Sequence, residues 1–184
     1  MNRLLRCAMV IAITLLEACE SGEAQRARVE KVDNYHGFHA GDSVPPTMVR
    51  CASGRTRTVG AVGALQLITL STPGDCSSCL AHLAGLEAIA RNYRAAGDDY
   101  VVAWSPGASL SGIQRTYAIT PSRDVCLDSA GALWDRLDIQ HTPVSVVLSS
   151  GRIVYMTDKA LSSEASQARL MADLASVGFP FFRR

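Results

Sequence analysis

Two cysteines separated by two residues, Cys76 and Cys79, are the side chains of this sequence best suited to chemistry. The preceding run 65–71 is short and apolar, which predicts a buried strand, and 72–75 (Thr-Pro-Gly-Asp) has the composition of a turn that ends in a helix-capping aspartate. Apolar side chains then recur at three- and four-residue steps through Tyr93, which indicates a helix. The two thiols should therefore lie one turn apart on one face, a spacing that suits a disulfide.

The helix start predicts different roles for the two thiols. Cys76 would open the helix, where unpaired backbone N–H groups and the helix dipole favour a thiolate, so we expect it to be the attacking sulfur. Cys79, one turn deeper, would be the resolving thiol. Three alternatives stay open: a structural disulfide, half of a zinc site, and a peroxide-reducing thiolate. Zinc is disfavoured because no second pair of ligands with comparable spacing follows in the sequence.

The first residues have the pattern of an export signal. Arg3 and Arg6 precede a short apolar run at 8–16, which is too short to span a bilayer. The run Leu-Glu-Ala-Cys that ends at Cys19 resembles the bacterial lipoprotein cleavage box, so we expect Cys19 to carry lipid. The alternative is an ordinary secretory signal cut nearby, for instance after Ala24. We predict a signal peptide at 1–18, a flexible tether at 19–34 and a folded domain at 35–184.

Composition argues against nucleic acid as a partner. The sequence has 18 basic and 17 acidic residues; cleavage before Cys19 would remove Arg3, Arg6 and Glu17, leaving 16 of each (18 − 2 and 17 − 1). The mature chain would be neutral, and it has no basic stripe.

Two further cysteines, Cys51 and Cys126, belong to the predicted domain. They could form a structural disulfide or be two buried small apolar side chains. Nothing in the sequence reports their separation, and we favour two buried free thiols.

The order of predicted elements indicates an α/β fold. Strands and helices alternate after an N-terminal hairpin, which implies parallel strands joined by helices and an antiparallel hairpin at one edge. The expected strands are 47–51, 56–59, 65–71, 99–105, 123–128, 144–148 and 152–156; the expected helices are 76 to about 96, 109–117, 131–137 and 162–177.

Over roughly residues 35–177 the chain resembles exported thioredoxin-like proteins of the TlpA/ResA type, in the AhpC/TSA–thioredoxin superfamily. The matching pieces are the opening 41–45, the strand before the Cys-x-x-Cys pair, and Thr142-Pro143 before an apolar strand that turns at 150–151. The resemblance implies a thioredoxin-like fold with a mixed central sheet flanked by helices and an N-terminal β-hairpin extension. It also implies that Pro143 is a cis-proline facing the dithiol, with Thr142 beside it, and that the two bind the substrate polypeptide.

The expected function is thiol–disulfide exchange with exported proteins, through a mixed disulfide on Cys76. We expect no cofactor and no metal. The expected partners are exported proteins with thiols or disulfides, a redox partner protein, and a membrane reached through the lipid on Cys19, facing the periplasm or the cell exterior. A thiol peroxidase and a non-catalytic binding or metal-carrier module are the alternatives.

Four other side chains carry weaker expectations. His82 is predicted on the helix surface and His141 in a loop near the active site. Trp104 and Trp134 are predicted in the core. The sequence assigns no proton-transfer partner to Cys79.

Overall fold

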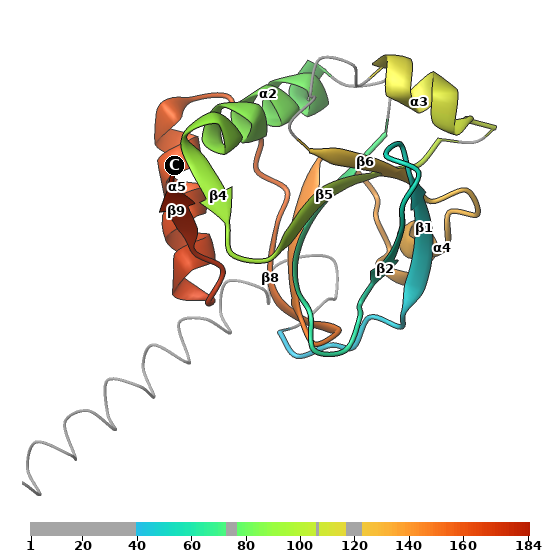
Figure 1. Cartoon of the computed structure of the whole chain (residues 1–184), viewed down its shortest axis with the longest axis horizontal. Helices are drawn as coiled ribbons and strands as arrows, with labels where there is room; N and C mark the ends of the chain where they lie inside the picture. The colour runs from blue at the N-terminus through green and yellow to red at the C-terminus, as the bar shows by residue number, and fades with distance from the viewer. Residues whose placement is uncertain (1–39, 73–76, 106, 117–122) are drawn as a thin grey trace, which may run out of the picture.

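A seven-stranded mixed sheet is the centre of the fold (Figure 1). The computed structural model describes residues 40–72, 77–105, 107–116 and 123–184. The strands of the main sheet are β1 (Thr47–Cys51), β2 (Thr56–Val59), β3 (Leu65–Ser71), β5 (Asp98–Ala103), β6 (Asp124–Leu127), β7 (Val144–Ser149) and β8 (Arg152–Thr157). The helices are α2 (Ser77–Asn92), α3 (Leu110–Thr116), α4 (Ala132–Arg136) and α5 (Glu164–Ser176).

The strand order is β2-β1-β6-β5-β3-β7-β8, with β3 near the middle. β3 runs parallel to β5 and antiparallel to β7, and β5 runs parallel to β6. The β1–β2 hairpin extends the sheet through an antiparallel pairing of β1 with β6. The predicted α/β architecture, its mixed sheet and its N-terminal hairpin extension are confirmed.

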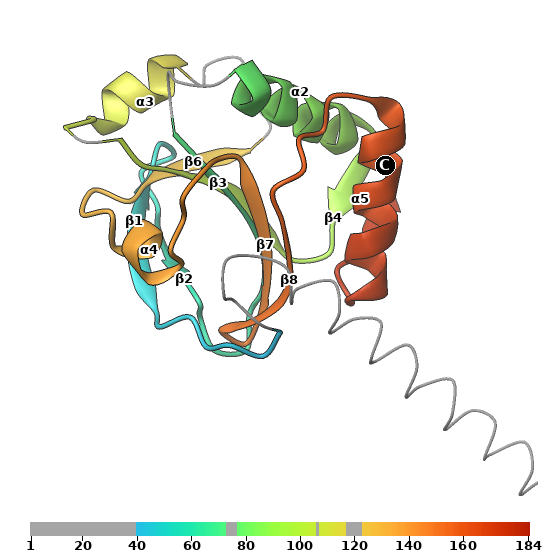
Figure 2. The ribbon, with the colours of Figure 1, turned by 180° about the vertical axis from the view of Figure 1, so that it is seen from behind.

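Helices cover both faces of the sheet, so the central strands are apolar on both sides. Along β3, Leu67 belongs to a core layer beneath α2, α3 and α5, whereas Ile68 and Leu70 belong to a second layer that includes residues of α4. Figure 2 shows α2 and α5 on one side of the curled sheet and α4 on the other. This alternation follows from the two-residue period of a strand.

Helix α2 ends earlier than predicted. It stops at Asn92, and the next residues form β4 (Tyr93–Ala95), which pairs with β9 (Phe181–Arg183) in a separate two-stranded sheet. The apolar C-terminal segment therefore packs on the domain, and Phe179 before β9 is fully buried. The helical period could not reveal this end of α2, because the competing backbone partner lies about 90 residues away in sequence.

A glycine brings α2 close to the chain that precedes α5. A methyl group at Gly85 would lie 2.5 Å from the Cβ atom of Leu161, closer than real Cβ atoms approach. Because Gly85 has no side chain, α2 packs directly on the segment that contains Leu161.

Cys51 and Cys126 form a disulfide, so the expectation of two buried free thiols is wrong. The two cysteines are directly opposite one another where β1 pairs antiparallel with β6, and both are fully buried. Residues opposite one another in antiparallel strands bring their Cβ atoms within about 4.5–5.5 Å. Strand pairing across 75 residues therefore creates a proximity that the sequence does not report.

Candidate active site

The candidate site lies where β3 ends and α2 begins. Thr72 follows the last residue of β3, and Cys79 lies in the first turn of α2. Asp75, the predicted helix cap, and Cys76, the predicted attacking thiol, are outside the described residues. Cys79 itself is buried, with 3% of its surface exposed, in agreement with the deeper position expected for it.

Thr142 links the two predicted halves of the site. Its Oγ1 atom lies 3.4 Å from Cys79 Sγ and 2.7 Å from Thr72 Oγ1, and it also accepts a hydrogen bond of 3.4 Å from the backbone N–H of Thr72. One hydroxyl therefore touches the end of β3, the first turn of α2 and the segment before β7. The antiparallel pairing of β3 with β7 produces this convergence, because Leu70 is opposite Val144.

The peptide bond between Thr142 and Pro143 is cis, as predicted. Pro143 is buried and immediately precedes β7. The contact of Thr142 with Cys79 places this segment beside the second cysteine of the motif. The role of Thr142 and Pro143 in binding a substrate polypeptide stays a prediction.

His82 is not on the helix surface, so that prediction is wrong. Its side chain is fully buried between α2 and the sheet, and its Nε2 atom lies 3.2 Å from Ser145 Oγ on β7. The signal for this burial is positional: His82 is three residues after Cys79 and four before Leu86, both of which are buried on the same helix face. The sequence prediction missed this burial because histidine is a polar residue type, although its position belongs to the apolar face of the helix.

Burial lowers the pKa of His82 from 6.5 to about 4, because the charged imidazolium loses its hydration. An interaction with the backbone of Lys159 opposes this effect, and the positive charge of Arg123 adds to it. The imidazole is therefore neutral at neutral pH.

This pKa predicts how stability depends on pH. In the unfolded chain His82 should titrate near its ordinary value of about 6.5, so between pH 6.5 and 4 the unfolded chain binds a proton that the folded chain does not. The free energy of unfolding should fall as pH falls through this window, by about 3 kcal/mol from this residue. Urea unfolding at pH 7 and pH 4 measures the loss, and His82→Leu should lose less. An equal loss in both proteins would contradict the prediction.

The remaining single-residue predictions concern His141, Trp104 and Trp134. His141 is an exposed loop residue, as predicted, with Nε2 3.0 Å from Asp158 Oδ2. Trp134 is buried, as predicted, whereas Trp104 is only partly buried and packs on the same layer, with the two ring centroids 5.9 Å apart.

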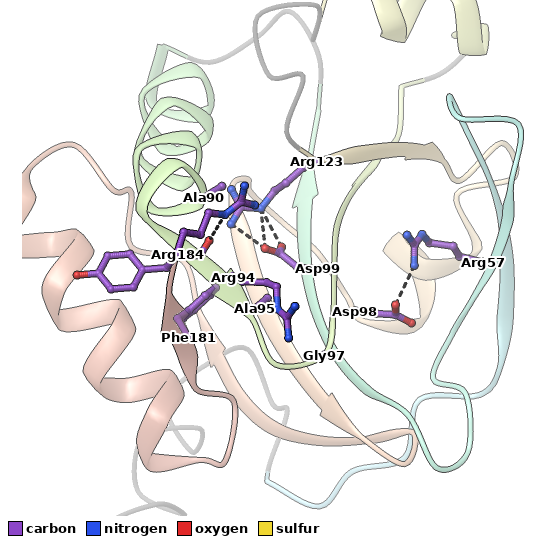
Figure 3. Close-up of a pocket in the computed structure, with 11 residues that line it drawn as sticks. Arg57, Ala90, Arg94, Ala95, Gly97, Asp98, Asp99, Arg123, Phe181 and Arg184 are labelled. Carbon is purple, nitrogen blue, oxygen red and sulfur yellow. Dashed lines mark hydrogen bonds and ion pairs between the residues drawn. The ribbon is translucent and has the colours of Figure 1, made fainter.

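A pocket of about 250 Å³ lies at the other end of α2 and is not part of this site (Figure 3). Its lining includes Ala90 near the carboxyl end of α2, more than ten residues beyond Cys79 on the same helix. The two carboxylates in its wall are engaged in ion pairs: Asp99 accepts from Arg123 Nε through both oxygens, at 2.8 and 2.9 Å, and Asp98 pairs with Arg57 at 3.0 Å. These pairs join the starts of β5 and β6 and the edge strand β2.

Among comparisons with known proteins, only the comparison with solved structures finds similar proteins. No family model matches the chain, and no curated protein matches it. A thio-disulfide isomerase from Thermus thermophilus has a TM-score of 0.60 and 18% identity, over 77% of this chain and 99% of that chain. A secreted Mycobacterium tuberculosis disulfide oxidoreductase, homologous to Escherichia coli DsbE, has a TM-score of 0.53 and 18% identity, over 71% and 95%. A peroxiredoxin-like protein from Aquifex aeolicus has a TM-score of 0.54 and 14% identity, over 74% and 88%.

The fold is thioredoxin-like. The predicted fold class is thereby confirmed. Within the thioredoxin-like fold of this chain, Cys79 lies in the first turn of α2, and Thr142 reaches it from the segment before β7. At these identities the likeness shows the fold and carries no residue roles.

Proposed function

We propose that this chain is a thiol–disulfide oxidoreductase of the TlpA/ResA type, which exchanges disulfides with exported proteins through Cys76 and Cys79. The contact between Cys79 Sγ and Thr142 Oγ1 carries the proposal, because it joins the second cysteine of the motif to the segment expected to bind substrate. The burial of Cys79 supports the same division of labour, since a buried sulfur is poorly accessible to a protein substrate and is left to act within the chain.

The reaction proceeds in two exchanges when the chain acts as a reductant. The Cys76 thiolate attacks one sulfur of the substrate disulfide, a mixed disulfide forms, and the other substrate sulfur leaves as a thiolate. Cys79 then loses its proton and attacks Cys76 Sγ. The bond between Cys76 and the substrate breaks, the second substrate thiolate leaves, and a Cys76–Cys79 disulfide remains. The reverse sequence oxidises a dithiol substrate. A redox partner protein would restore the starting state.

A redox titration of the full chain tests this proposal. The protein is equilibrated in thiol–disulfide buffers, alkylated, and mapped by peptide mass, so that Cys76 and Cys79 are followed apart from Cys51 and Cys126. We expect one two-electron transition of the Cys76–Cys79 pair at a potential between about −120 and −270 mV. Failure of these two cysteines to cross-link at any potential would overturn the proposal.

A thiol peroxidase is the second candidate, favoured by the structural likeness to a peroxiredoxin-like protein and by the hydroxyl of Thr72 near the motif. The two candidates differ in their oxidant. Peroxide consumption that survives loss of Cys79 and exceeds disulfide exchange would select the peroxidase.

We also propose that the protein is exported and anchored to a membrane by lipid on Cys19. The basic start, the short apolar run and the Leu-Glu-Ala-Cys sequence support this, although they lie outside the described residues. Among the described helices, none combines the length and hydropathy needed to cross a bilayer. Intact-mass analysis of a membrane fraction should show a lipid-modified chain beginning at Cys19, and an unmodified chain beginning elsewhere would contradict the assignment.

A further inference from the structure

Three polar side chains interrupt the apolar layer between α2 and the sheet. His82 on α2, Ser145 on β7 and Thr69 on β3 are each at least 99% buried. Thr69 and Ser145 are directly opposite one another where β3 pairs with β7, and His82 bonds Ser145. The neighbouring positions of this layer are apolar: Leu67, Leu83, Leu86, Val101 and Val147. We call His82, Ser145 and Thr69 the buried polar cluster.

The buried polar cluster is incompletely satisfied. Within the part of the chain that the structure describes, His82 Nδ1 and Thr69 Oγ1 have no hydrogen-bond partner. Leaving a buried polar atom unpaired is destabilising, and most buried polar groups are paired. Leucine or valine at these positions would continue the apolar layer without an unpaired polar atom. Packing alone therefore does not explain the histidine at position 82.

The cluster lies next to the resolving cysteine. His82 is three residues after Cys79 on α2, so the two side chains are neighbours on one helix face. The same short segment contacts both residues, since Thr142 bonds Cys79 and Ser145 bonds His82. In the tautomer whose Nε2–H donates to Ser145 Oγ, the lone pair on Nδ1 is the one that can accept a proton.

We propose that His82 is the proton acceptor for the Cys79 thiol during resolution of the mixed disulfide. The inference rests on the proposed function. In this step the Cys79 S–H proton passes to His82 Nδ1, the Cys79 sulfur forms a bond to Cys76 Sγ, and the substrate leaves as a thiolate. The imidazolium then returns its proton to the departing thiolate or to water. A neutral imidazole in the resting state is required, and burial supplies it.

The groups around His82 allow it to hold a proton only briefly. Arg123, which is ion-paired with Asp99, disfavours the imidazolium, whereas the backbone of Lys159 favours it. The imidazolium form of His82 is therefore unfavourable in the resting protein. It is stabilised only while the Cys79 sulfur beside it carries a negative charge. An acceptor of this kind is neutral throughout pH 6–8, so the rate of resolution should be nearly independent of pH in that range.

Single-turnover reaction with Ellman's reagent separates the two steps, in the full chain with Cys7 and Cys19 replaced by serine so that Cys76 and Cys79 are the thiols that react. With Cys76 and Cys79 reduced, attack by Cys76 releases one thionitrobenzoate, and resolution by Cys79 releases a second. In the unaltered protein we expect the second phase to change less than about threefold from pH 6 to 8. A thiol that ionises unaided would instead speed up about tenfold per pH unit below its pKa of about 8.5.

Substitution of His82 should expose that unaided behaviour. In His82→Gln, which keeps an amide to bond Ser145, and in His82→Leu, the second phase should slow at least about tenfold at pH 7 and recover above pH 9. The first phase should be unchanged. Thr69→Val is the matched control, because it removes a polar atom of the same cluster without touching the proton acceptor, and it should leave both phases unchanged.

Three results would overturn the role of His82: an unchanged second phase in both variants, slowing by the same factor at every pH, or a tenfold-per-unit rise in the unaltered protein. The last measurement needs no variant, so it stands even if the substitutions prevent folding. Absence of the first phase, or of any Cys76–Cys79 disulfide afterwards, would instead contradict the proposed function itself.

Discussion

Replacing Cys79 with serine should make the protein accumulate mixed disulfides with its substrates through Cys76. The attacking thiol remains, but the sulfur that would displace the substrate is gone. An intramolecular thiol acts with a very high effective concentration, so multiple turnover with an external thiol as the only resolving group should fall by at least about 100-fold. Non-reducing electrophoresis of membrane extracts, followed by mass mapping of the adduct, measures this outcome.

The matched control is the reciprocal variant. Cys76→Ser should form no adducts, because buried Cys79 is a poor acceptor for a protein substrate. The double variant Cys76→Ser/Cys79→Ser should behave in the same way. Adducts that require Cys79 and persist without Cys76 would reverse the assigned roles of the two thiols.

Removing the disulfide between Cys51 and Cys126 should produce the largest loss of stability. The bond joins β1 to β6 across 75 residues of sequence, so in the chain-entropy description it restricts the unfolded chain by about 4 kcal/mol. Replacement of both cysteines by alanine avoids placing hydroxyl groups in the core. We expect the free energy of unfolding in guanidinium chloride to fall by about 2–5 kcal/mol, with thiol–disulfide exchange retained in the fraction that remains folded.

Reductant provides the control for this second prediction. With enough reductant present to open the bond on unfolding, the natural protein should unfold at nearly the denaturant concentration of the double-alanine variant. Without reductant the two should differ. Equal unfolding midpoints without reductant would show that the β1–β6 pairing is stable without its cross-link.

His82 shows what helical periodicity does and does not predict. The three- and four-residue steps place positions 79, 82, 83 and 86 on one face, so the buried face itself was predictable. Which side chain meets a polar partner was not, because Ser145 lies on a strand 63 residues later and is brought to α2 only by the pairing of β7 with β3. The polar character of histidine favoured the prediction that His82 lies on the helix surface.

The sequence by itself determined the elements whose signals are local. β3 occupies 65–71 and the N-terminal hairpin occupies 47–51 and 56–59, as their apolar runs and turn residues predicted. Cys79 lies in the first turn of the helix that follows β3, and the X-Pro bond at Pro143 is cis, both in line with the sequence pattern and the family resemblance. The tertiary structure decided the contacts between segments far apart in sequence: the disulfide, the β4–β9 pair, and the meeting of Cys79 and His82 with Thr142 and Ser145. The physical reason is that periodicity along one segment reports which face is buried, whereas the identity of what covers that face depends on strand order and register.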